Sequence, residues 1–157
     1  MQRFQVPKTK ASVLVEIPPR APEPRHVFLA PLAQGHRGAE NPSDIFNEPR
    51  AFIPLFCEDG RTTLARREAI TWIMVGDPRR AEWYYYETRA GASEARIHIE
   101  FDTGSHLEGA VALLGPEAGR RLIDVVNRTG PFLHVERGEE LFLVNLRRVA
   151  SITITGE

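Results

Sequence analysis

The sequence predicts a mainly β protein in which two tandem small β-modules pack as a pseudo-symmetric pair, each a strongly bent antiparallel sheet or a partly open barrel with one short helix. Three observations lead to this expectation. Apolar and polar residues alternate along short segments, turn residues separate those segments, and the same order of segments occurs twice in 157 residues. With 42% hydrophobic and 26% charged residues, the composition excludes a disordered chain and a membrane bundle.

The first half contains five predicted strands. The clearest is the first, in which Val13, Val15 and Ile17 share one face, and the four prolines between residues 18 and 24 end it in an extended loop. A second loop is expected at residues 34–40. The predicted strands lie at residues 12–17, 26–32, 51–57, 61–65 and 70–75.

Residues 76–80 contain glycine, aspartate and proline and mark a boundary in the middle of the chain. The aromatic run at residues 83–86 follows, and we expect it to be extended because aromatic residues favour strands. The segment pattern then begins again. The predicted strands of the second half lie at residues 95–101, 107–114, 132–136, 140–145 and 149–155.

Each half also carries one predicted helix, at residues 41–47 and 119–127. Asn41 is a suitable cap, and Asn47 and Asn127 are expected to end their helices in the left-handed conformation. Asp44 and Asp124 occupy matching positions in these helices. A matched aspartate in two successive modules indicates support for a helix start rather than a catalytic pair.

The two halves align at an offset of 80 residues through their helix-and-strand blocks, which indicates an internal duplication. We therefore expect a flexible arm at residues 1–11, a first module at 12–76, a connecting segment with the aromatic strand at 77–93, and a second module at 94–157. Modules of this size are marginal as independent cores, so the halves should fold as one unit.

The second half carries the block Arg121-Leu122-Ile123-Asp124-Val125-Val126-Asn127, then Phe132-Leu133, and then a strand ending in Val144-Asn145. This pattern resembles an uncharacterised bacterial small-β domain family recognised by R-L-x-D-x-x-N, then F-[IL], then a closing V-N strand. The first half departs from it, with Asn41-Pro42 in place of Arg-Leu and Arg66 in place of the strand asparagine. The resemblance implies a fold in two divergent copies and carries no activity.

No catalytic or cofactor motif is present in the sequence. It contains no phosphate-binding or dinucleotide-binding glycine pattern and no nucleophile elbow. The five histidines lack metal-ligand spacing, and the single Cys57 excludes an intrachain disulfide. We therefore expect no enzyme activity, no metal and no cofactor.

The partner is expected to be another protein, because a net charge of −1 provides no general attraction for nucleic acid. The aromatic run lies in the seam between modules or forms a binding patch. We take Trp83, Tyr84, Tyr86, Arg147 and Arg148 as the candidate contact residues and expect a non-catalytic adaptor or regulatory module. The alternative is an RNA- or nucleotide-binding small barrel that uses the arginine pairs, and self-pairing into a homodimer stays open.

No apolar run is long enough for a membrane span, and the first ten residues lack the features of a secretion signal. The sequence therefore predicts a cytoplasmic protein without a membrane partner.

Overall fold

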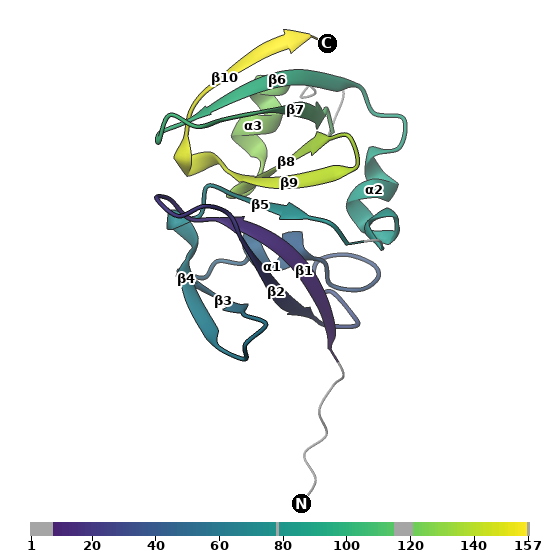
Figure 1. Cartoon of the computed structure of the whole chain (residues 1–157). Helices are drawn as coiled ribbons and strands as arrows, with labels where there is room; N and C mark the ends of the chain where they lie inside the picture. Colours follow the sequence, from purple (N-terminus) through teal and green to yellow (C-terminus); the bar gives the residue numbers. More distant parts are fainter. Residues whose placement is uncertain (1–7, 78, 115–120, 157) are drawn as a thin grey trace, which may run out of the picture.

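The computed structural model describes residues 8–77, 79–114 and 121–156, which form ten antiparallel strands in one open sheet (Figure 1). The predicted mainly β class is confirmed, and the sheet is open rather than a closed barrel. No helix in the described ranges has the length and apolar character needed to cross a membrane. The strands are β1 (Thr9–Glu16), β2 (Glu23–Leu29), β3 (Phe52–Phe56), β4 (Thr62–Arg66), β5 (Trp72–Val75), β6 (Glu94–Phe101), β7 (His106–Ala112), β8 (Phe132–Arg137), β9 (Glu140–Asn145) and β10 (Val149–Gly156).

The sheet order, β10-β6-β7-β8-β9-β5-β1-β2-β3-β4, contains the same five-strand arrangement twice. We call β1–β5 with their helix the first repeat and β6–β10 with theirs the second repeat. The pairing registers also match: Leu64 lies opposite Pro54 as Leu143 lies opposite His134. The module boundaries given above stay a prediction, but strand order and register are the same in both halves.

The repeats are joined where β9 of the second pairs with β5 of the first (Figure 1). Because both strands are covered on both faces, alternate residues of this joint enter two different cores. The residues that pack into the first repeat's core are Ile73, Val75, Leu141 and Leu143. The residues that pack into the second repeat's core are Trp72, Met74, Phe142 and Val144. Each core is thus completed by a strand of the other repeat.

Two short helices occupy matching places in the repeats, α1 (Pro42–Asn47) and α3 (Leu122–Arg128). Asn41 caps α1 as predicted, and Asp44 closes a capping box with it. The predicted left-handed ends are wrong, because no described non-glycine residue has a positive φ and Glu48 continues in extended conformation. The amide of Asn47 has another role, described below. The first residues of the second predicted helix lie outside the described ranges.

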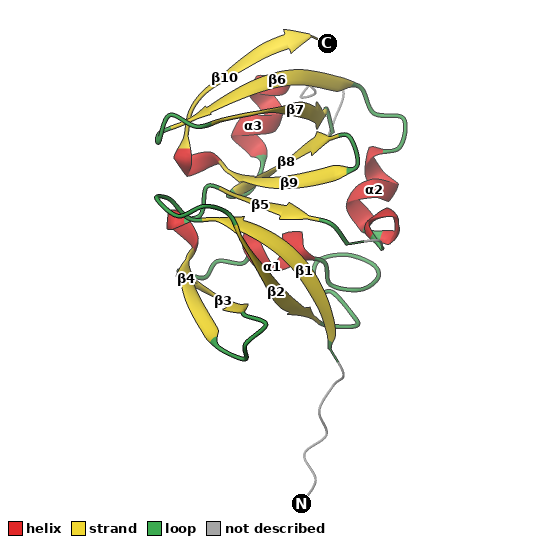
Figure 2. Cartoon of the chain, viewed as in Figure 1, coloured by secondary structure: helices red, strands yellow, loops and turns green. Residues whose placement is uncertain are grey.

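The predicted aromatic strand is wrong: residues Tyr84–Arg89 form the helix α2, preceded by the 3₁₀ turn η2 (Arg80–Glu82) (Figure 2). Helical spacing brings Trp83 and Tyr86 to one face, where both pack against the first repeat's core. Tertiary burial of this face outweighs the strand preference of the aromatic side chains. Two further 3₁₀ turns, η1 (Arg67–Ala69) and η4 (Leu146–Arg148), join β4 to β5 and β9 to β10.

Candidate functional site

A large groove opens on the first repeat where β2 and β3 separate. These strands pair at a single position, His26 opposite Phe56, and then diverge. The resulting cavity has a volume of about 1290 Å³ and is bordered by α1 and by the loop that follows β2. Phe28 and Phe56 line it with their rings edge to face at 4.9 Å, beside Pro54. Phe28 remains 37% exposed, so an aromatic surface is open to solvent.

The carboxylates that line the groove all have partners within the chain. Glu40 accepts a hydrogen bond from the Ala30 N–H at 3.1 Å, and Glu48 lies 2.6 Å from the Arg50 guanidinium. Asp44 accepts the Asn41 N–H at 2.8 Å, which leaves its charge engaged by the helix start. The groove thus combines carboxylates that have hydrogen-bond or ion-pair partners with the exposed aromatic surface of Phe28 and Phe56.

Asp44 also holds the loop beside the groove through His36, whose Nε2 lies 2.8 Å from the carboxylate. Burial lowers the pKa of His36, but the hydrogen bonds to the Arg37 carbonyl and to Asp44 outweigh it and raise the pKa above its ordinary value. The His36 ring stacks on Tyr84 of α2 at 5.6 Å. The loop is therefore fixed at one end of the groove by a charge-assisted contact.

In the second repeat, the positions that match Pro54 and Phe56 are His134 and Glu136, and α2 covers both. The Tyr85 ring meets the His134 ring edge to face at 4.1 Å. Arg89 forms an ion pair with Glu136 at 3.0 Å. Burial raises the pKa of Glu136 despite the nearby arginine. α2 therefore contacts the surface of the second repeat that matches the groove, and the cavity left there is smaller, about 340 Å³.

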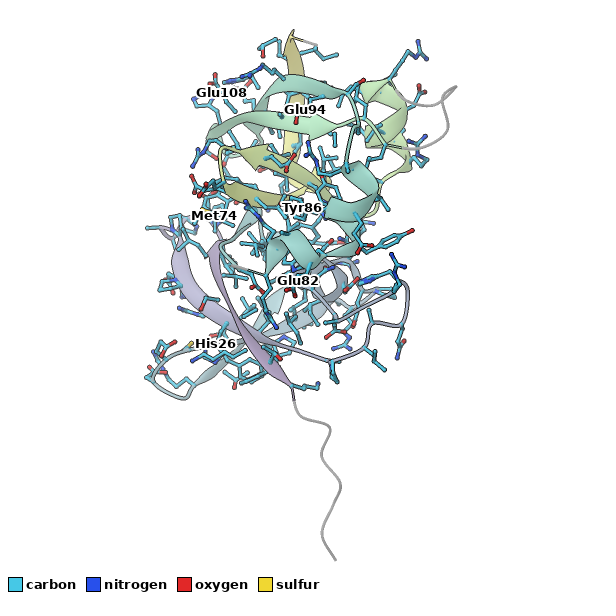
Figure 3. The ribbon with its side chains drawn as sticks, turned by 90° about the vertical axis from the view of Figure 1, so that its right-hand side faces the viewer. His26, Met74, Glu82, Tyr86, Glu94 and Glu108 are labelled. Atoms are coloured by element: carbon cyan, nitrogen blue, oxygen red, sulfur yellow. The ribbon has the colours of Figure 1, made fainter. Side chains whose placement is uncertain are left out.

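The predicted contact residues are divided between two sides of the molecule. Trp83 is buried, Tyr86 is half-buried at the level of the joint, and Tyr84 is 44% exposed but stacked on His36 (Figure 3). Arg147 and Arg148 lie in η4, the turn between β9 and β10 at the left of Figure 2, whereas α2 lies at the right. The structure therefore does not gather these five residues into one surface.

The arginine pairs at residues 66/67 and 147/148 are engaged by groups of the chain itself. Contacts between η1 and η4 bring the pairs 66/67 and 147/148 near each other. Arg147 pairs with Glu68, and Arg148 lies 3.1 Å from Asp102. Arg66 lies over the Phe52 ring at 4.6 Å, and Arg67 donates to the Glu48 carbonyl. No observation on these residues favours RNA binding.

One contact was missed by sequence reasoning: Ser43 of α1 lies 2.7 Å from His134 Nε2 of β8. Such a pair resembles a nucleophile and its base. However, the Asn47 amide also donates to Ser43 Oγ at 3.1 Å, and burial lowers the pKa of His134 to about 4. An imidazole with that pKa is a weak base at neutral pH. The residues are 91 positions apart, and no sequence signal links them.

No three histidine, cysteine, aspartate or glutamate side chains come together in a metal-binding arrangement within the described ranges. Cys57 is half-buried, with Sγ 3.9 Å from Thr63 Oγ1.

Comparisons with family models, with curated proteins and with solved structures find no match to this chain. The resemblance of the second half to a small-β domain family stays a prediction.

Proposed function

We propose that this chain is a non-catalytic protein-interaction module whose first repeat binds an apolar, aromatic segment of a partner protein in the groove between β2 and β3. The observation that supports this most is the contrast between the repeats. Phe28 and Phe56 line a cavity of about 1290 Å³, whereas α2 contacts the matching surface of the second repeat and leaves a cavity of about 340 Å³ there. The ligand would take the place in the first repeat that α2 takes in the second.

The groove chemistry defines the ligand. Pro54 stands where His134 contacts the Tyr85 ring, and a proline ring is an apolar surface against which an aromatic side chain packs. Phe56 stands where Glu136 receives Arg89, so the ligand needs no cation at that position. We therefore expect a short segment with one aromatic anchor and neighbouring aliphatic residues.

The absence of catalysis is part of the proposal and rests on the polar contacts of Ser43 and His134. The histidine stays neutral at physiological pH, and Ser43 is held by Asn47 at the same time. This network links α1 to β8, which is a structural task.

Selection of random peptides displayed on phage against the full chain tests the proposal. We expect enriched peptides to share an aromatic residue and Phe28→Asp to weaken their binding by about tenfold or more in fluorescence anisotropy, because aromatic anchors dominate such interfaces. Ile123→Asp, at an exposed apolar residue of α3, is the matched control and should bind as the unmodified chain does. Failure to enrich peptides, or equal binding by Phe28→Asp, would refute the proposal.

A further inference from the structure

The two free edges of the sheet, β4 and β10, are the repeat equivalents of the two strands that are joined inside the molecule. The internal joint pairs β9 with β5. When the two repeats are aligned, β9 of the second repeat corresponds to β4 of the first, and β5 of the first corresponds to β10 of the second. The chain therefore carries one unused copy of each partner, and the two lie at opposite ends of the sheet (Figure 1).

The pairing of β10 with its neighbour reproduces that of β5. Ile152 lies opposite Ile99 on β6 as Ile73 lies opposite Val15 on β1, and Ile154 lies opposite Ile97 as Val75 lies opposite Val13. The register of β4 on β3 also matches that of β9 on β8. Because both registers are kept, the outer edges of β10 and β4 point their backbone groups outward as β5 and β9 do in the joint.

Transfer of the internal register to the free edges gives a defined set of residue pairs. Leu64 falls opposite Ile152, as Leu143 lies opposite Ile73. The neighbouring pairs are Thr62 with Ile154, Thr63 with Thr153, and Ala65 with Ser151. Leu64 is 66% exposed and Ile154 is 51% exposed, which is unusual for large apolar side chains on a sheet edge.

Neither edge segment carries the usual protection against pairing. Residues 62–65 and 151–154 contain no charged residue and no proline. The irregularities of β10 lie at Ala150 and Thr155, on either side of its regular four-residue segment. That segment has the length of β5, the strand used inside the molecule.

We propose that copies of this chain associate head to tail, with β4 of one copy pairing with β10 of the next in the register of the internal joint. Such an interface uses two different surfaces of each copy, so it extends to a ring or a filament rather than stopping at a symmetric dimer. Ser151 and Thr153 stand where Trp72 and Met74 lie in the internal joint. The joint between copies is therefore less apolar, and we expect association to be reversible and concentration-dependent.

Sedimentation velocity of the full chain over a concentration series tests the association, together with two edge-blocked variants. Leu64→Lys blocks β4 and Ile154→Lys blocks β10, both at exposed side chains that leave the cores intact. Each variant alone should associate about tenfold or more weakly than the unmodified chain, because a charge would be buried in the joint. An equimolar mixture should form a 1:1 dimer, since each variant still carries one intact edge. Ile123→Lys should associate as the unmodified chain does.

Three results would overturn the proposal: a chain that stays monomeric at every soluble concentration, association that is as strong in either blocked variant as in the unmodified chain, or a mixture that forms no dimer. The register is tested separately in a Cys57→Ser background. There, Thr63→Cys in one copy and Thr153→Cys in another should form an intermolecular disulfide, whereas Thr63→Cys with Ile123→Cys should not. Equal crosslinking of both pairs would contradict the proposed register.

Discussion

At the scale of single residues, Asn47 connects the two repeats. Its amide nitrogen donates to the Ser43 carbonyl at 3.0 Å and to Ser43 Oγ at 3.1 Å. Its amide oxygen accepts the Phe132 N–H of β8 at 3.0 Å. Gly130 lies close by, and a Cβ there would approach Asn47 Oδ1 to 3.0 Å. One side chain thus satisfies groups on α1 and at the start of β8.

Asn47→Ala should lower the free energy of unfolding by about 1–3 kcal/mol, because the Phe132 N–H loses its partner in a partly buried place. Urea denaturation followed by circular dichroism measures this. Asn127→Ala is the control, since Asn127 holds the matching position in α3 but is exposed. Equal losses for the two variants would show that the link from Asn47 to β8 adds little.

His134 should make stability depend on acid pH. Burial lowers its pKa in the folded protein from 6.5 to about 4, so the unfolded chain binds a proton between these values while the folded chain does not. The free energy of unfolding then has its full value above pH 6.5 and falls, by up to about 3 kcal/mol, as the pH drops to about 4. The effect of His36 on the free energy of unfolding has the opposite pH dependence, because the pKa of His36 is raised in the folded protein.

Urea titrations at several pH values between 4 and 7 measure this dependence. The histidine contribution is the difference between the unmodified chain and His134→Gln, whose amide can accept the Ser43 hydrogen bond without titrating. His106→Gln, at an exposed position of β7, controls for loss of a histidine. A slope that is the same with and without His134 would contradict the assignment.

At the scale of elements, α2 contacts both repeats across the joint of β5 and β9, and is not a free binding surface (Figure 3). It is attached to the second repeat through Arg89 and Tyr85, and to the first through the Tyr84 stack on His36 and the packing of Tyr86. Trp83, just before the helix, enters the first repeat's core. The helical spacing of Trp83 and Tyr86 was the sequence signal for α2. The strand preference of the aromatic residues led to the prediction of a strand instead.

Tyr84 and Tyr86 of α2 should therefore affect the free energy of unfolding differently. Tyr86→Ser should lower the free energy of unfolding by about 2 kcal/mol, because the ring is half-buried against Trp83 at 6.2 Å. Tyr84→Ser should cost less than about 1 kcal/mol, since that side chain is 44% exposed. Thermal and urea unfolding of both variants distinguish these values. A stable Tyr86→Ser protein would return α2 to the candidate binding surfaces.

At the scale of the whole molecule, the alternation and capping patterns of the sequence predicted the strands and helices but did not predict how the two repeats are joined. The alternation of Ile97, Ile99 and Phe101 was sufficient to predict β6, and capping chemistry was sufficient for α1. The joint was not predicted, although continuous apolar runs at Trp72–Val75 and Leu141–Val144 are typical of strands buried on both faces. The groove was not predictable either, because the divergence of β2 from β3 depends on packing and leaves no pattern in either strand.

The shared joint should make the two repeats unfold together. Leu143 belongs to the second repeat in sequence but packs in the first repeat's core, and Phe142 beside it packs in the second. Leu143→Ala should lower the free energy of unfolding by about 2–5 kcal/mol, and amide exchange should accelerate in both repeats within a single transition. Leu64→Ala, at the matching but 66% exposed position of β4, should change stability by less than about 0.5 kcal/mol when measured at dilute concentration. Two separate transitions, or accelerated exchange confined to one repeat, would show that the cores are independent. The same leucine position thus stabilises the molecule where its strand is joined and contributes little where the edge is free.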